Sequence, residues 1–134
     1  MIKDIQFKRV EDIAVAVAPG KDDGQEEVWV VYLLNMKDKA ITGVLVNSKG
    51  YGTLDGKEVK TSSLRQFFDE IGSGDYVKLE IMPEKYRALS NQFWVSFWLD
   101  GFLYDKQFVF VTDSIVQENF TFIPILNKKG VMIR

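Results

Sequence analysis

The chain has 134 residues, carries a formal net charge of -2 and contains neither histidine nor cysteine. This length suits a single domain over residues 1–134, with a core large enough to fold without a metal or a disulfide. The missing cysteine excludes disulfides, thiolate nucleophiles and cysteine-based zinc sites, and the missing histidine excludes the usual catalytic triads and the commonest metal ligand.

The N-terminal segment lacks the features of a secretory signal. Its apolar run over residues 13–18 is short, follows Glu11 and Asp12, and ends at Pro19 without a small-residue cleavage pattern. The sequence also contains no run of about 18 apolar residues, the length that a membrane-spanning helix needs. We therefore expect a cytoplasmic protein that does not enter a membrane.

The first half of the chain has the pattern of β-strands between turn-forming segments. Alternating Ile and Val side chains should form the inward face of a strand over 12–18, and the alanines on its other face are small enough for another layer to approach closely. The segment 28–34 is apolar on both faces, which predicts a central, covered strand. The segment 40–48 follows after a short connection, so we expect it to pair antiparallel with 28–34.

Two later segments continue this pattern. Residues 77–82 alternate in polarity, so Ile81 and the other odd-numbered apolar residues are expected to point inward. The chain closes with a predicted hairpin around the turn at residues 127–130. Because proline cannot donate a hydrogen bond to a sheet ladder, Pro124 places this hairpin at a sheet edge.

One segment has helical spacing instead. Within residues 62–71 the apolar residues fall at i, i+3, i+4 and i+7, the stripe of an amphipathic helix: Leu64, Phe67, Phe68 and Ile71. Ser63 and Gln66 have capping-box spacing, and Gly72 stands where a left-handed C-cap would lie. We predict a helix over 62–71 and a second, short helical turn over 113–119. The strands and these helices together predict a mainly β, single-domain antiparallel β-sandwich or open barrel.

The most informative stretch is a hairpin over residues 92–111. Its dipeptide Asp100-Gly101 predicts a two-residue type I′ turn, which fixes the register so that Leu99 opposes Phe102. One face of the hairpin is mostly apolar and is expected to face the core, although Lys106 also falls on it. The opposite face carries the candidate binding residues: Trp94, Ser96, Trp98, Leu103, Asp105 and Gln107.

Three interpretations of that opposite face stay open. The helix over 62–71 would cover it in the first, and the two tryptophans would then be buried packing. In the second it is a protein-interaction or homodimer surface, with the tryptophans as anchors and Ser96, Asp105 and Gln107 as a polar rim. In the third it is a platform for a small ligand such as a sugar ring.

No motif in the sequence indicates a catalytic or metal site. The acidic loop around Asp22 lacks a calcium-binding framework, and the segment 49–52 lacks the spacing of a phosphate-binding loop. Carboxylates are numerous, but the sequence places no two of them at a defined separation. The acidic balance argues against nucleic acid as a partner.

We therefore expect no cofactor and no catalytic residue. We interpret the chain as a non-catalytic binding or protein-interaction module whose partner is another protein or a second copy of itself, with its small-molecule ligand unknown. One alternative is a carbohydrate-binding or carboxylate-based carbohydrate-cleaving module, in which the tryptophans stack on sugar rings. Another is an RNA-associated accessory protein, which requires the scattered basic residues to converge on one face.

Three segments resemble those of a small bacterial family of unknown function: residues 45–52, 91–97 and 123–134. The resemblance covers essentially the whole chain, and it implies a free-standing protein without known catalytic residues. Some members carry a phenylalanyl-tRNA synthetase subunit label. The chain does not support that label, because it is far too short for a synthetase catalytic domain and has no ATP-binding signature.

Overall fold

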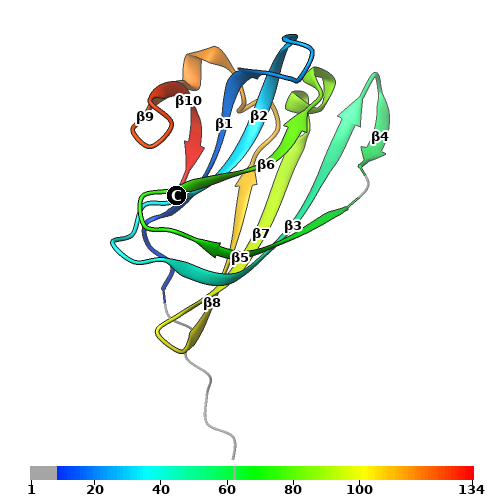
Figure 1. Cartoon of the computed structure of the whole chain (residues 1–134). Coiled ribbons are helices and arrows are strands. Elements are labelled where there is room, and N and C mark those ends of the chain that lie inside the picture. The colour runs from blue at the N-terminus through cyan, green and yellow to red at the C-terminus, as the bar shows by residue number, and fades with distance from the viewer. Residues whose placement is uncertain (1–8, 62) are drawn as a thin grey trace, which may run out of the picture.

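The computed structural model describes residues 9–61 and 63–134, which form two antiparallel sheets stacked as a sandwich (Figure 1). The first sheet has the strand order β6–β2–β1–β10–β9, with the bounds Tyr76–Met82, Glu27–Asn35, Ile13–Lys21, Lys128–Ile133 and Thr121–Ile123. The second has the order β4–β3–β7–β8, with the bounds Lys57–Lys60, Ile41–Leu54, Ser90–Leu99 and Phe102–Phe110. Strand β5, Leu64–Ile71, pairs with β3 on the edge that β4 also uses. The predicted mainly β fold is confirmed, in its sandwich form.

The main core lies between the two sheets. Ile13, Val15 and Val17 of β1 point into it and belong to one buried cluster with Phe93 and Phe97 of β7. Burying apolar surface of this kind contributes about 25 cal/mol per Å² and is the main force that holds the two sheets together. The inward face predicted for the first strand is thus confirmed.

The other face of β1 is covered as well. Ala14 and Ala16 form a second buried cluster with Ile123 at the end of β9. Gly130 of the neighbouring β10 comes so close to β1 that an added Cβ would lie 2.5 Å from the carbonyl oxygen of Val17. Ile125 and Leu126, which follow β9, pack against this cluster, so the C-terminal segment supplies the close second layer that the small side chains of the alanine face predict.

Residues 64–71 form a strand, so the predicted helix over 62–71 is wrong; Ser62 lies outside the described residues. Strand β5 pairs antiparallel with the first part of β3. This pairing satisfies backbone groups along an edge of β3 that a helix would have left open, and it overrides the helical spacing. In the strand Phe67 is exposed whereas Phe68 packs against the main core, so the expected stripe is divided between solvent and core.

The expected pairing of 28–34 with 40–48 is also wrong. These segments form β2 and β3, and β2 lies between β1 and β6 in the first sheet. The connection that follows Asn35 carries the chain across to the second sheet (Figure 1). A short connection is compatible with a hairpin but also with a crossover between packed sheets, and the apolar face on each side of β2 favours the latter.

Strand β6 contains a β-bulge that overturns part of its expected alternation. Val31 of β2 faces Glu80, but the next residue of β2 faces Lys78, so Leu79 is the extra residue. Because a bulge shifts the alternation by one position, Ile81 is exposed instead of buried. Glu80 is partly buried, which the sequence did not predict.

Asn35, at the end of β2, links two segments that connect the first sheet to the second: the one that follows β2 and the one that follows β5. It is fully buried, and its Nδ2 donates hydrogen bonds to the carbonyl oxygens of Lys39, Ile71 and Gly72 at 2.9 to 3.1 Å. Its Oδ1 accepts a hydrogen bond from the backbone N–H of Lys37 at 3.0 Å. One side chain thus connects the segment that leaves β2 to the end of β5.

The remaining expectations concern the ends of the chain and the short helices. Strands β9 and β10 pair as the predicted terminal hairpin, and β9, followed directly by Pro124, lies at the edge of the first sheet. Residues 113–119 contain the 3-10 turn η2, Gln117–Asn119, and a second 3-10 turn, η1, spans Glu84–Ala88. Within residues 9–61 and 63–134 the structure has no helix of the length and apolar character needed to cross a membrane.

Candidate functional site

The β7–β8 hairpin forms with the predicted register. Asp100 and Gly101 have positive φ angles of 51° and 81°, as a type I′ turn requires, and the pairing continues without a shift along both strands. A hydrogen bond of 3.0 Å from Lys39 Nζ to Asp100 Oδ2 raises the pKa of Lys39. This exposed ion pair connects the tip of the hairpin to the segment between β2 and β3.

The inward face of the hairpin is the core face. Phe93, Val95 and Phe97 of β7 are buried in the main cluster. Lys106, opposite Val95, is on this face without any bulge in the hairpin, and it is only partly buried. Its Nζ lies 5.1 Å from the centre of the Phe108 ring, a cation–π distance. The aliphatic part of this lysine can therefore pack inward while its charge stays near the rim.

The opposite face of the hairpin is open to solvent. Trp94, Trp98 and Leu103 are 44%, 48% and 41% exposed. The polar candidates of the same face lie between and beside them: Ser96, Asp105 and Gln107. The interpretation of this face as buried packing is wrong, because the segment expected to cover it is β5, a strand of the same sheet.

Strands β3 and β5 extend this surface into three rows that run across β5, β3, β7 and β8. We call these residues the outer face. The first row is Arg65, Asn47, Trp94 and Gln107; the second is Phe67, Leu45, Ser96 and Asp105; the third is Glu70, Thr42, Trp98 and Leu103. The structure thus brings all six predicted residues together and adds six from β3 and β5. Among the additions Phe67 is 61% exposed, the most exposed apolar side chain of the face.

Two hydrogen bonds join pairs of side chains on the outer face. The indole Nε1 of Trp94 donates to Oδ1 of Asp105 on the adjacent strand. On the other side of the face, Nε of Arg65 donates to Oδ1 of Asn47 at 3.0 Å. These two contacts restrain the side chains of Trp94 and Arg65 on the open surface.

Trp98 is positioned by a glycine. The register between β3 and β7 shifts near Gly43, whose φ of 55° lies in the left-handed region that favours glycine. A Cβ at Gly43 would lie 3.0 Å from Cδ1 of Trp98. The bulged backbone of β3 therefore leaves space against which the edge of the Trp98 ring lies.

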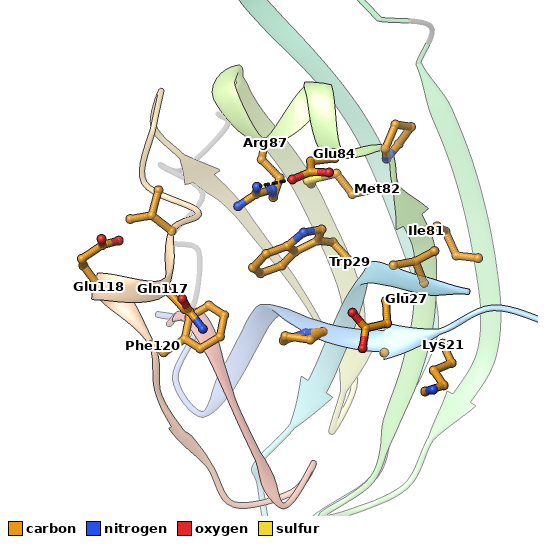
Figure 2. Close-up of a pocket in the computed structure, with 15 residues that line it drawn as sticks. Lys21, Glu27, Trp29, Ile81, Met82, Glu84, Arg87, Gln117, Glu118 and Phe120 are labelled. Carbon is orange, nitrogen blue, oxygen red and sulfur yellow. Dashed lines mark hydrogen bonds and ion pairs between the residues drawn. The ribbon is translucent and has the colours of Figure 1, made fainter. Parts of the chain in front are cut away.

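A groove that the sequence did not predict surrounds Trp29 (Figure 2). Its volume is about 920 Å³, and its walls come from the end of β1, the start of β2, the end of β6 and the two 3-10 turns with the residues beside them. The guanidinium of Arg87 lies 4.3 Å from the centre of the Trp29 ring, and the Phe120 ring meets Trp29 edge-on at 5.7 Å. Arg87 also forms an ion pair of 3.0 Å with Glu84. The sequence placed Trp29 in an apolar strand but did not indicate the groove, because the groove is assembled from segments far apart in the sequence.

A smaller cavity of about 230 Å³ lies beside the bulge in β6. Its lining includes Glu80, Ser48 and Asn91. Burial raises the pKa of Glu80, because water stabilises the ionised carboxylate better than the protein interior does. The bulge thus places a carboxyl group in a cavity without making it part of the outer face.

Charge does not dominate the outer face. Its charged residues are Arg65, Glu70 and Asp105, so it lacks the basic footprint that RNA binding requires. In the part of the chain that the structure describes, no group of three or more acidic side chains is arranged to hold a metal ion. The outer face is therefore defined by exposed apolar surface with hydrogen-bonding groups around it.

Comparisons with known proteins supply no relative from which a function could be transferred. No family model matches the chain, and neither a curated protein nor a solved structure matches it at a significant level. A sandwich fold by itself does not define an activity, so the function has to be argued from the site.

Proposed function

We propose that this protein is a non-catalytic protein-interaction module that binds its partner through the outer face. The observation that carries this proposal is the exposure of four large apolar side chains on one sheet face: Phe67, Trp94, Trp98 and Leu103. Contiguous exposed apolar surface marks interaction sites, and tryptophan is among the residues that contribute most to binding at interfaces.

The shape of the face favours a protein over a small molecule. Small ligands bind in concave sites that bury most of their surface, whereas the outer face is the broad surface of four strands. The polar residues around the apolar ones, such as Arg65, Asp105 and Gln107, match the polar rim of a protein interface. Self-association as a homodimer is the simplest use of such a surface. A cytoplasmic location stays a prediction of the sequence.

The absence of catalysis is part of the proposal. The chain has no histidine and no cysteine, and the charged groups of the outer face serve to position neighbours. Asp105 accepts the hydrogen bond of Trp94, and Arg65 donates to Asn47. These contacts favour a rigid binding surface over proton transfer.

A carbohydrate-binding module is the second candidate, and the groove around Trp29 is the observation in its favour (Figure 2). The groove combines aromatic rings with the carboxylates of Glu27 and Glu118, groups that sugar-binding sites use. However, the guanidinium of Arg87 already occupies one face of the Trp29 ring. Because of this contact, that face of the Trp29 ring is not available for stacking on a sugar.

Site-specific photo-crosslinking in cells tests the proposed function. p-Benzoylphenylalanine at position 67 places the probe on the outer face, and the same probe at position 78, an exposed site on β6, is the matched control. We expect one defined protein adduct from position 67, absent from position 78 and reduced by Trp94→Ala with Trp98→Ala. The lack of any adduct at position 67, or the same adducts from both positions, would overturn the proposal.

A further inference from the structure

We infer that the cavity beside the bulge in β6 binds a small primary amine through its ammonium group. The cavity lies between the two sheets, whereas the outer face is the opposite side of the second sheet. This inference therefore stands apart from the proposed function. Its lining includes three side chains that carry oxygen atoms, each from a different strand: Glu80 of β6, Ser48 of β3 and Asn91 of β7.

Ser48 has a buried hydroxyl group without a hydrogen-bond partner in the described protein. The residue is paired with Phe93 of the main core, so its side chain points between the sheets, and it is only 6% exposed. Among residues 9–61 and 63–134 no group forms a hydrogen bond with this hydroxyl. Native proteins keep few buried polar groups in this state, because each one has lost its bonds to water. Since Ser48 lies on the cavity wall, a molecule inside the cavity can be its partner.

Asn91 presents a second oxygen to the cavity. The residue is 6% exposed, and its Nδ2 donates hydrogen bonds of 2.9 and 3.0 Å to the carbonyl oxygens of Tyr86 and Leu89. These two bonds use the amide nitrogen, and within the described residues no group donates to Oδ1. Gly50, also in the lining, is so close that an added Cβ would lie 3.2 Å from this oxygen. The missing side chain of Gly50 therefore leaves room for a donor beside Asn91.

The bulge in β6 directs Glu80 into the same space. Glu80 is paired with Val31, a residue of the main core, so its carboxyl group points between the sheets. Gln66 holds the bulge from the other sheet, because its Nε2 donates a hydrogen bond of 2.7 Å to the carbonyl oxygen of Leu79. The carboxyl group is thus held opposite the second sheet by backbone pairing and by this bond.

Glu80 has no counter-ion among the described residues. Burial is the cause of its raised pKa, and no neighbouring charge contributes to the shift. Lys49 is the other charged residue of the lining, but it follows Ser48 directly in β3, so its side chain leaves from the opposite side of the strand. A partly buried carboxylate without a cation is costly, and a bound cation would recover part of that cost.

An ammonium group matches this set of acceptors. It carries one positive charge and three N–H donors, whereas the carboxylate would repel an anion. A divalent metal ion is less suitable, because it takes six or more oxygen ligands and the described residues hold no group of three acidic side chains around a site. Met82 and Pro83 add apolar surface to the lining. The volume of about 230 Å³ is several times the roughly 30 Å³ of a water molecule, so the ligand has room for a short alkyl or aryl chain.

Nuclear magnetic resonance of the full chain, titrated with butylamine, tests the inference. Butylamine stays charged at mildly alkaline pH, since the pKa of an alkyl ammonium group such as that of lysine is about 10.4. Butan-1-ol is a neutral probe of the same length. We expect saturable shifts of the amide signals of Ser48, Glu80 and Asn91 with butylamine, and binding of butan-1-ol that is more than about tenfold weaker.

Two variants test the residues of the cavity. Glu80→Gln keeps the size of the side chain and removes its charge, so it should weaken butylamine binding more than about tenfold. Ser48→Ala removes one acceptor and should weaken binding several-fold. The matched controls are Glu58→Gln on the exposed strand β4 and Ser114→Ala, whose buried hydroxyl also lacks a hydrogen bond to the described residues but lies outside the cavity. Both controls should leave the affinity for butylamine unchanged.

Three results would overturn the inference. Shifts that do not saturate, or that spread over the surface instead of the cavity, would mean that the cavity holds water only. Equal affinity for butylamine and butan-1-ol would mean that the charge of the amine contributes nothing. Unchanged affinity in Glu80→Gln, in a variant whose spectrum is that of a folded protein, would remove Glu80 from the site. None of these results affects the crosslinking at position 67, so the proposed function is tested separately.

Discussion

The indole Nε1 of Trp94 donates a hydrogen bond to Oδ1 of Asp105 on the neighbouring strand. Trp94 is paired with Gln107, and Asp105 is paired with Ser96, so this contact runs diagonally between two rows of the outer face. It restrains the ring of a tryptophan that is otherwise open to solvent. A ring held in this way loses less conformational freedom when a partner binds.

Replacing Asp105 with leucine should therefore make the Trp94 ring more mobile. Fluorescence anisotropy decay of Trp94, measured with Trp29→Phe and Trp98→Phe, should show faster local motion in Asp105→Leu. Asp105→Asn keeps an oxygen acceptor and should resemble the parent protein. The free energy of unfolding should change by less than about 1 kcal/mol, because the contact is exposed. Equal ring mobility in all three proteins would contradict the positioning role of Asp105.

Removal of both exposed tryptophans should leave the protein folded. Trp94→Ala with Trp98→Ala should lower the free energy of unfolding by less than about 2 kcal/mol, since both rings are nearly half exposed already. The buried Phe97→Ala is the matched comparison and should cost about 3–5 kcal/mol. Urea denaturation of the three proteins checks this difference. Loss of cooperative unfolding in the double variant would mean that the tryptophans belong to the core.

Asn35→Ala should be among the most destabilising polar substitutions in this chain. The change leaves three carbonyl groups and one backbone N–H without their side-chain partner in the interior. We expect a loss of about 2–3 kcal/mol in the free energy of unfolding. Asn119→Ala removes a single exposed hydrogen bond to the carbonyl of Ser114 and should cost under about 1 kcal/mol. Similar losses for both variants in urea would show that the crossovers do not depend on Asn35.

Glu80 should make the stability of the protein depend on pH. Burial raises its pKa above the ordinary value of 4.5, so the folded state holds this proton more tightly than the unfolded state. This contribution to stability is fully present below the unfolded pKa and is lost as the pH rises through the folded pKa. Glu80→Gln should remove that decline, whereas Glu58→Gln on the exposed strand β4 should not. Urea denaturation at pH values below and above the folded pKa of Glu80 measures the change in the free energy of unfolding. Parallel pH dependence for the parent protein and Glu80→Gln would show that Glu80 is not its cause.

The fold could be predicted where local chemistry determines it. Asp100-Gly101 favours one turn type, that turn fixes one register, and the whole β7–β8 hairpin follows from two residues. Strand β5 could not be predicted in this way, since its apolar residues have helical spacing. The deciding factor is the open edge of β3, which is distant in the sequence and offers backbone hydrogen bonds. The bulge at Leu79 likewise depends on how β6 meets β2.

The candidate site likewise has a part that local sequence determines and a part that depends on tertiary pairing. The register placed Trp94, Trp98 and their polar neighbours on one face, and the structure has them there. Whether that face is open depended on the segment 62–71, and the helix expected there would have hidden it. Leu45 and Phe67 join the outer face only because β3 pairs with β5 on one side and β7 on the other. Their membership is a tertiary property that the spacing of residues does not reveal.

The pairing of β1 with β10 has a consequence for the synthesis of the protein. The two strands are neighbours in the first sheet, although β10 is made long after β1. The β1–β2 and β7–β8 hairpins join strands that are close in sequence, so they can form while the chain is still on the ribosome. Until β10 leaves the exit tunnel, one edge of β1 and its alanine face stay uncovered. During that interval the nascent chain presents an apolar strand edge of the kind that chaperones recognise and that aggregation exploits.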